Sequence, residues 1–233
     1  SSVKLLRAGF AIQSGKRTNR VTGERNMRRD TVGVSIGYAA ALTQAVAFAW
    51  YGVAIISATV HTNPISWWLW LAETFIGLLI YTDRTRDFSK WITEAVAFVG
   101  VVLVSAYLLW RILIEGDAAF ILEPVEVVDF VSAIAAVAAF VFWIGTRKKI
   151  GAGTALWLFQ IALVLAALPL IRSTLLNPSA EPLWPWLLWT FSFTLQLVCA
   201  IWRWDGFEPL LNPLNYAITH GVVAVIILLN VAR

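Results

Sequence analysis

Carboxylate and imidazole side chains that fall within long apolar stretches are the residues most able to do chemistry in this sequence. Glu73 lies inside the apolar stretch 62–81, and Glu94 and His220 interrupt two later ones. An unpaired charge in hydrocarbon costs roughly 2.5–3.5 kcal/mol on insertion scales, so such groups normally have a partner or a task. Glu73 could exchange a proton or bind a polar solute, or it could be a neutral or paired carboxyl that holds helices together.

Glu94 and His220 occupy matching positions in two similar segments. Residues 92–94 read Ile-Thr-Glu, and residues 218–220 read Ile-Thr-His. A carboxyl and an imidazole that converge on one axis could bind a substrate or carry a proton, because histidine titrates near neutrality. The alternatives are a structural ion pair between them, or a local pair of Glu94 with Lys90 one helical turn earlier.

Three amide side chains form a second set of candidates. Gln44 and Gln160 end the similar segments Leu-Thr-Gln and Leu-Phe-Gln, and Asn215 stands about one turn before His220. These amides could contact a solute near the middle of the membrane. They could equally be packing contacts, because an interhelical hydrogen bond in a membrane contributes roughly 0.6 kcal/mol on average.

Tryptophan and proline complete the set of candidate site residues. Most of the 13 tryptophans lie near the ends of apolar stretches, where they would anchor the chain at the membrane interface. Trp68 and Trp186 could instead form the walls of a pocket and stack on a planar ring or a sugar face. Pro169 removes a backbone hydrogen bond within its stretch and could line a cavity or act as a gate.

The composition indicates the element that must position these residues, which is the membrane helix. Of 233 residues, 59% are hydrophobic and 14% are charged, with a mean hydropathy of +0.74. A soluble domain carries roughly 25% charged residues. The apolar runs are continuous rather than alternating, which excludes strands and predicts an all-α polytopic membrane protein. We expect seven spans, at Val32–Ala58, Ile65–Tyr81, Phe88–Ile114, Val127–Thr146, Thr154–Ser173, Leu183–Trp202 and Leu211–Val231.

Basic residues predict the orientation of these spans. The basic tail 1–31 and the basic loops that follow the second, fourth and sixth spans fall on one side, whereas the acidic stretch 115–129 falls on the other. The positive-inside rule then places the N-terminus inside and the C-terminus outside, in an integral membrane protein that we expect in a bacterial inner (cytoplasmic) membrane. Residues 1–30 are a cytoplasmic tail attracted to anionic lipid, an organellar targeting remnant, or a contact arm in a larger assembly.

Matching segments in the same order predict an internal repeat. Residues 32–114 form the first three-helix repeat and residues 151–233 the second, with a linker helix inside 115–150. Three spans per repeat need one extra span to return the second repeat to the same orientation. The result is a 3+1+3 plan with parallel repeats.

This plan resembles the SWEET/PQ-loop superfamily, to which PnuC-type vitamin transporters are related. Besides the plan, the residues that carry the resemblance are the two proline–tryptophan entries Pro64-Ile-Ser-Trp-Trp-Leu-Trp70 and Pro182-Leu-Trp-Pro-Trp-Leu-Leu-Trp189, and Pro169. The resemblance covers most of residues 32–231 and is one of plan rather than of strict motif. It implies a path for a small polar solute between the two repeats.

Other function classes find no support in the sequence. It has no phosphate loop, no nucleophile–histidine–acid set and no zinc-binding spacing, so we expect neither an enzyme nor a cofactor. The net charge of +4 is explained by membrane orientation rather than by nucleic acid. We therefore expect a transporter for a sugar- or vitamin-like solute, in contact with the lipid bilayer. The alternative is a non-transporting subunit or scaffold of a larger membrane complex, and either form could be a homo-oligomer or join other membrane subunits through residues 1–30.

Overall fold

The computed structural model describes residues 30–57, 60, 62, 64–84, 87–116, 127–146, 152–204 and 206–231, and within them it contains helices and no strands. The all-α prediction is therefore confirmed for this part of the chain. The helices are the N-terminal helix Asp30–Ile56, α2 (Pro64–Arg84), α3 (Phe88–Trp110) with a π-helical extension η1 (Arg111–Glu115), α4 (Val127–Thr146), α5 (Ala152–Leu176), the 3₁₀ turn η3 (Pro178–Ala180), α6 (Leu183–Trp202) and α7 (Glu208–Val231).

Five helices of the described chain are long and apolar enough to cross a membrane, which agrees with an integral membrane protein. These candidate spans are Asp30–Ile56, Phe88–Ile114, Phe159–Leu176, Leu183–Trp202 and Pro209–Val231. Helices α2 and α4 do not belong to this set, so the count of seven spans stays a prediction. Their bounds, like those of the other helices, lie within three residues of the predicted ones at each end when α3 is taken together with its extension η1.

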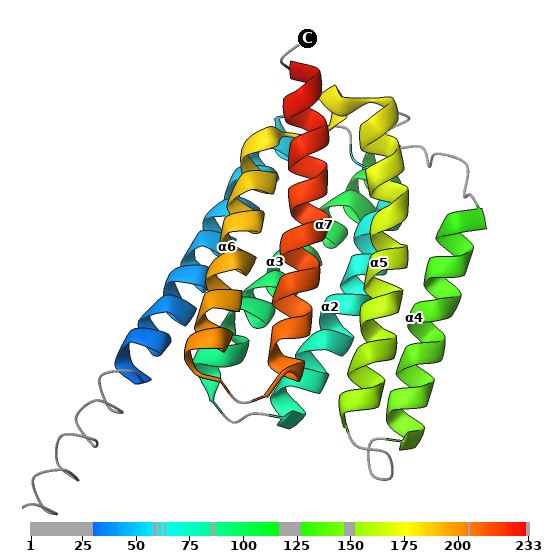
Figure 1. Ribbon diagram of the computed structural model, residues 1–233. Helices are drawn as coiled ribbons and strands as arrows, with labels where there is room; N and C mark the ends of the chain where they lie inside the picture. Colours follow the sequence, from blue (N-terminus) through cyan, green and yellow to red (C-terminus); the bar gives the residue numbers. More distant parts are fainter. Residues whose placement is uncertain are drawn as a thin grey trace, which may run out of the picture.

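Consecutive helices run in opposite directions, as Figure 1 shows by the alternating direction of the colour gradient. The N-terminal helix therefore begins at the end of the bundle opposite to the C-terminus. Among helices α2 to α7, the most extensive contacts are those of α6 with α7, of α2 with α3, and of α5 with α4 and α7. Helix α4 lies at one edge of the bundle, with α5 as its main neighbour and α2 as a weaker one (Figure 1).

The centre of the bundle contains buried aromatic and polar side chains, whereas its periphery is apolar. Trp67, Trp186 and Trp189 are each only 1% exposed, and Tyr51 is completely buried. In contrast, large apolar side chains cover the outer surfaces of the helices, among them Leu42, Val53, Leu103, Ile134, Ile161, Ile218 and Leu229. Apolar side chains outside and polar side chains inside are the arrangement that a lipid environment favours.

Prolines interrupt the backbone hydrogen bonding of two helices, and for one of them a side chain supplies a replacement hydrogen bond. Pro213 lies inside α7 and has no N–H to bond the carbonyl of Pro209, four residues earlier. The Tyr81 hydroxyl of α2 donates a hydrogen bond to that carbonyl at 3.3 Å. Pro169 lies buried inside α5, within the predicted span Thr154–Ser173.

Several sequence predictions concern residues outside the described chain. They are those on the basic tail, on most of the acidic loop and on the basic loop after α4, which fall on residues 1–29, 117–126 and 147–151. The predicted membrane orientation depends on these segments and stays a prediction.

Candidate functional site

An aromatic cage surrounds a small cavity at the centre of the bundle. Trp67 and Trp70 of α2 pack against Trp186 and Trp189 of α6, with ring centroids 5.8 Å apart for Trp70 and Trp186. All of these except Trp186 line the cavity. The cavity measures about 20 Å³, enough for about one water molecule. It is lined by Gln44, Phe48, Trp67, Trp70, Thr74, Ala97, Val101, Trp189, Phe193, Tyr216 and His220.

The spacing of the four tryptophans explains why they converge. Trp67 and Trp70 are three residues apart, as are Trp186 and Trp189, and residues three apart lie on one face of a helix. The proline–tryptophan entries of α2 and α6 therefore present matching aromatic faces to each other. This i, i+3 pair in each entry is the sequence signal for the cage.

His220 of α7 is held inside the cage in a defined orientation. Its Nδ1 lies 2.7 Å from the carbonyl oxygen of Tyr216, and because a carbonyl only accepts, Nδ1 carries the proton and donates. Nε2 is then the hydrogen-bond acceptor of the ring. The imidazole stacks on Trp70 at 5.8 Å and lies 5.3 Å from the rings of Trp186 and Phe193.

Buried polar atoms near the cavity lack hydrogen-bond partners within the described residues. Gln44 Oε1 and Trp189 Nε1 are two of them, and both residues line the cavity. A buried donor or acceptor without a partner costs about 1–3 kcal/mol. Gln44 Oε1 as acceptor and Trp189 Nε1 as donor could together hydrogen-bond a small polar molecule in the cavity.

A chain of hydrogen bonds crosses the bundle beside the cage. Asn212 of α7 donates to Glu94 Oε1 of α3 at 2.7 Å and accepts from Gln160 of α5 at 3.1 Å. Asn215 of α7 donates to the side-chain oxygen of Gln160 at 2.9 Å and to its backbone carbonyl at 3.1 Å. Glu94, Gln160 and Asn215 were predicted site residues, and this network brings the three together through Asn212.

Glu73 of α2 is fully buried, and neither of its carboxyl oxygens has a hydrogen-bond partner within the described residues. The Tyr216 phenol lies close enough to both Glu73 and Glu94 to interact with them electrostatically. The two carboxyls therefore belong to one interior region next to the cage. Neither of them lines the small cavity itself.

Glu181 forms a second buried cluster at one end of the bundle, just before α6. Tyr51 of the N-terminal helix donates to Glu181 Oε2 at 3.0 Å, and Trp186 Nε1 donates to the same oxygen at 3.1 Å. Burial raises the pKa of Glu181 to about 7, although hydrogen bonds from Tyr51, Trp186 and Thr62 act in the opposite direction. Beside it, Trp67 Nε1 donates to Thr62 Oγ1 at 2.8 Å.

Arg203 forms an ionic cluster at the other end, just after α6. Its guanidinium pairs with Asp87, donates to Ser89 Oγ at 2.6 Å, and lies 3.9 Å from Asp30. Partial burial raises the pKa of Asp87, but hydrogen bonds from Ser89 and Arg203 and the Arg203 charge outweigh it, so this pKa is below its ordinary value. The two clusters thus stabilise the two ends of the bundle by different interactions, namely hydrogen bonds to a buried carboxyl at one end and ion pairs at the other.

The predicted site residues thus fall into two neighbouring groups and some separate positions. His220 and Gln44 line the cavity of the cage, and Trp186 contacts His220. Glu94 and His220 do not bond each other, because Glu94 bonds Asn212 and His220 bonds the Tyr216 carbonyl. Trp68 is half-buried, whereas its neighbour Trp67 lies in the cage. Asn212 was a lesser candidate from the sequence, whereas the predicted site residues did not include Trp67, Trp70, Trp189, Glu181 and Arg203.

Comparisons of the chain with protein-family models, with curated proteins and with solved structures find no match. The resemblance to the SWEET/PQ-loop superfamily therefore stays a prediction. Within the part of the chain that the structure describes, no three His, Cys, Asp or Glu side chains gather as a metal site would require.

Proposed function

We propose that this protein carries a small polar solute across a membrane through the aromatic cage between two three-helix repeats. The single observation that supports this most is the set of unpaired polar groups in the interior. Among the described residues, Glu73 has two buried oxygens without a partner, and Gln44 and Trp189 each have one such atom beside the cavity. A protein built only to be rigid would pair these groups, since each unpaired one lowers stability.

The 3+1+3 plan with seven spans is part of the proposal, and two regularities support it. Trp67 and Trp186 each donate from Nε1 to an oxygen five residues earlier, on Thr62 and Glu181. The pairs α2·α3 and α6·α7 are both extensively packed, as a repeat requires. Helix α4 has α5 as its main neighbour, in keeping with a linker at the edge of the bundle.

The closed ends support a specific form of the proposal, in which the structure is an occluded state. The Glu181 cluster and the Arg203 cluster each join the N-terminal helix to α6, which belong to different repeats. Opening one cluster while the other stays closed would expose the cage to one side at a time. Pro169, which removes one backbone hydrogen bond of α5, would ease the rocking of one repeat against the other.

Ligand binding to the cage is the experiment that tests this function. Purified protein in detergent would be titrated with glucose, sucrose, thiamine and nicotinamide riboside, with intrinsic tryptophan fluorescence and the melting temperature as readouts. We expect one compound to quench the fluorescence and to raise the melting temperature. Proteoliposome uptake of that compound, with and without a proton gradient, would follow, and Glu73→Gln should abolish the effect of the gradient.

Trp189→Phe separates a functional role of the cage from a structural one. The substitution removes an N–H that has no partner among the described residues, so it should leave the melting temperature nearly unchanged while weakening ligand binding about tenfold, or ~1.4 kcal/mol. Trp184→Phe is the matched control, because Trp184 lies on the same helix and is 57% exposed. Equal binding by both variants would contradict the proposal.

A subunit or scaffold of a larger membrane complex is the second candidate function. The observation that favours it is the size of the cavity, which holds about one water molecule and is surrounded by packed aromatic rings. Purification in mild detergent followed by mass determination tests it. Foreign subunits in a fixed ratio would support this function, and a lone chain or a homo-oligomer would favour transport.

A further inference from the structure

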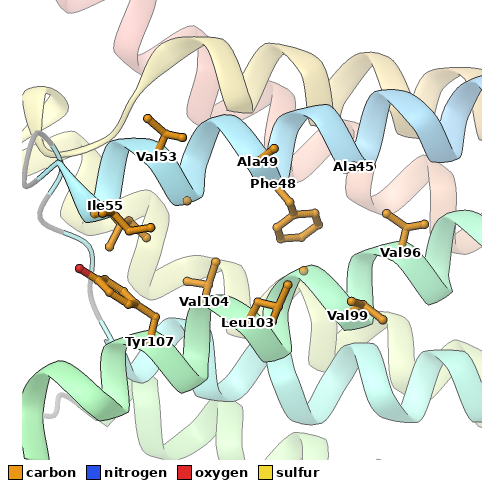
Figure 2. Close-up of a pocket in the computed structure, with 13 residues that line it drawn as sticks. Ala45, Phe48, Ala49, Val53, Ile55, Val96, Val99, Leu103, Val104 and Tyr107 are labelled. Atoms are coloured by element: carbon orange, nitrogen blue, oxygen red, sulfur yellow. The ribbon is translucent and has the colours of Figure 1, made fainter.

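A second, larger cavity opens on the surface of the bundle between the N-terminal helix and α3. This apolar groove measures about 440 Å³ and is lined by Ala45, Phe48, Ala49, Gly52, Val53, Ile55, Ile56, Val96, Val99, Gly100, Leu103, Val104 and Tyr107. Figure 2 shows Phe48 of the N-terminal helix and Leu103 and Val104 of α3 in the space between the two helices, with the Tyr107 hydroxyl at one end. The groove is separate from the Glu181 and Arg203 clusters.

Small residues keep the two helices from filling the groove. Gly52 has open space where a Cβ atom would lie, and Ala45 and Ala49 precede it on the same helix. On α3, a Cβ atom at Gly100 would lie 2.3 Å from the Phe48 ring, so Phe48 can pack against the α3 backbone only because residue 100 is glycine. Small residues on both helices therefore determine the shape of the groove.

The length of the groove matches one leaflet of a bilayer. From Val96 to Tyr107 on α3, eleven steps of about 1.5 Å give about 16 Å. One leaflet contributes about half of a hydrocarbon core that is about 30 Å thick.

A cation and two aromatic rings stand at one end of the groove. Arg111 Nη1 donates to the Tyr107 hydroxyl at 3.1 Å, and the guanidinium lies 6.0 Å from the centre of that ring. Tyr107 in turn lies 5.7 Å from Trp110. Tyrosine and tryptophan are typical of the membrane interface, and the arginine guanidinium matches the geometry of a phosphate group.

We propose that this groove binds one acyl chain of an anionic phospholipid, whose phosphate lies at Arg111. The apolar walls take the chain over the depth of one leaflet, and the tyrosine–arginine pair takes the headgroup at the interface. A lipid fits the length of the groove, its apolar lining and the cation at its end.

Native mass spectrometry of the full chain tests this proposal with phosphatidylglycerol and phosphatidylcholine of identical acyl chains. We expect one phosphatidylglycerol per chain, bound about tenfold more tightly than phosphatidylcholine, because the anionic lipid keeps its full charge for Arg111. Arg111→Gln should reduce this ratio to about one. A ratio that is unchanged in Arg111→Gln would overturn the assignment of the headgroup.

Gly52→Phe blocks the groove, and Gly145→Phe is its matched control. Both glycines are helical and have open space at the Cβ position, but Gly145 lies on α4, away from the groove. We expect Gly52→Phe to weaken lipid binding at least tenfold and Gly145→Phe to leave it unchanged, with equal melting temperatures. Equal lipid binding by the two variants would overturn the proposal, as would a homodimer that only Gly52→Phe dissociates.

Discussion

Different interactions hold the two ends of α6: hydrogen bonds to a buried carboxyl before the helix, and an ionic cluster after it. Before the helix, the Glu181 carboxyl is 5% exposed and receives hydrogen bonds from Tyr51 and Trp186, with no cation among these partners. After the helix, Arg203 binds Asp87 and Ser89 as a charged group. Both clusters join α6 to the first part of the chain, so each is a latch between the proposed repeats.

The difference predicts that only one end responds to pH near neutrality. Burial raises the pKa of Glu181 to about 7, so this carboxyl is neutral at pH 5 and charged at pH 8. The pKa of Asp87 is below its ordinary value of 3.8, so this carboxylate keeps its charge throughout that range. A proton can therefore control the Glu181 end independently of the other.

The largest expected effect is the loss of this pH response in Glu181→Gln. Because the folded pKa of about 7 exceeds the ordinary 4.5, the contribution of Glu181 to stability is complete below pH 4.5 and is lost as pH rises through 7. The loss is on the order of 3 kcal/mol when complete, which Glu181→Gln avoids because an amide does not ionise. Melting temperatures in detergent at pH 5 and pH 8 measure it.

Wild type should melt several degrees lower at pH 8 than at pH 5, whereas Glu181→Gln should show a smaller difference between the two pH values. Thr62→Ser provides the control, since Thr62 accepts from Trp67 as Glu181 accepts from Trp186 but does not titrate. The asymmetry between the ends would be disproved by a Glu181→Gln variant whose melting temperature falls as much as that of wild type.

The second effect is the loss of the ionic latch in Arg203→Ala. The variant loses the bonds to Asp87 and Ser89 and the packing of the Arg203 stem against Gly33, where a Cβ atom would lie 2.2 Å from that stem. We expect destabilisation of about 2 kcal/mol, the range for hydrogen bonds to charged groups. Chemical or thermal unfolding followed by tryptophan fluorescence measures it.

Arg203→Lys is the matched variant, because it keeps the charge and loses the planar fork. It should lose about half as much stability as Arg203→Ala. Both losses should be the same at pH 5 and pH 8, since Asp87 titrates below this range. Losses that differ between the two pH values would place a titrating group at this end.

The sequence predicts the helices well because each apolar run ends at polar or proline residues. Helices α4 and α6 have the predicted bounds, Val127–Thr146 and Leu183–Trp202. The N-terminal helix begins two residues before the predicted span and ends two residues earlier than expected. Hydropathy decides these bounds, and hydropathy is a local property of the chain.

The partners of the polar residues could not be predicted, because they depend on how the helices rotate against each other. Glu94 was expected to meet His220, but it bonds Asn212, which lies about two turns before His220 on α7. Matching positions in two repeats face one axis only if both helices have the same rotation and depth. Glu181 was not predicted as a site residue for a different reason: a carboxylate that precedes an apolar run is normally an exposed loop residue.

The smallest expected effects come from removing one hydroxyl at each end, in Tyr51→Phe and in Ser89→Ala. Tyr51 donates to Glu181, and Ser89 accepts from Arg203 and donates to Asp87. At pH 5 each substitution should cost about 1 kcal/mol, the usual net value of a hydrogen bond. At pH 8 the cost of Tyr51→Phe should rise to about 2 kcal/mol, because its acceptor is then ionised. The cost of Ser89→Ala should stay constant, since its acceptor Asp87 is ionised at both pH values. Unfolding free energies of the two variants at pH 5 and pH 8 measure this difference. If the cost of Tyr51→Phe were independent of pH, Glu181 would have the same charge at both values, and the Glu181 end could not act as a proton-controlled latch.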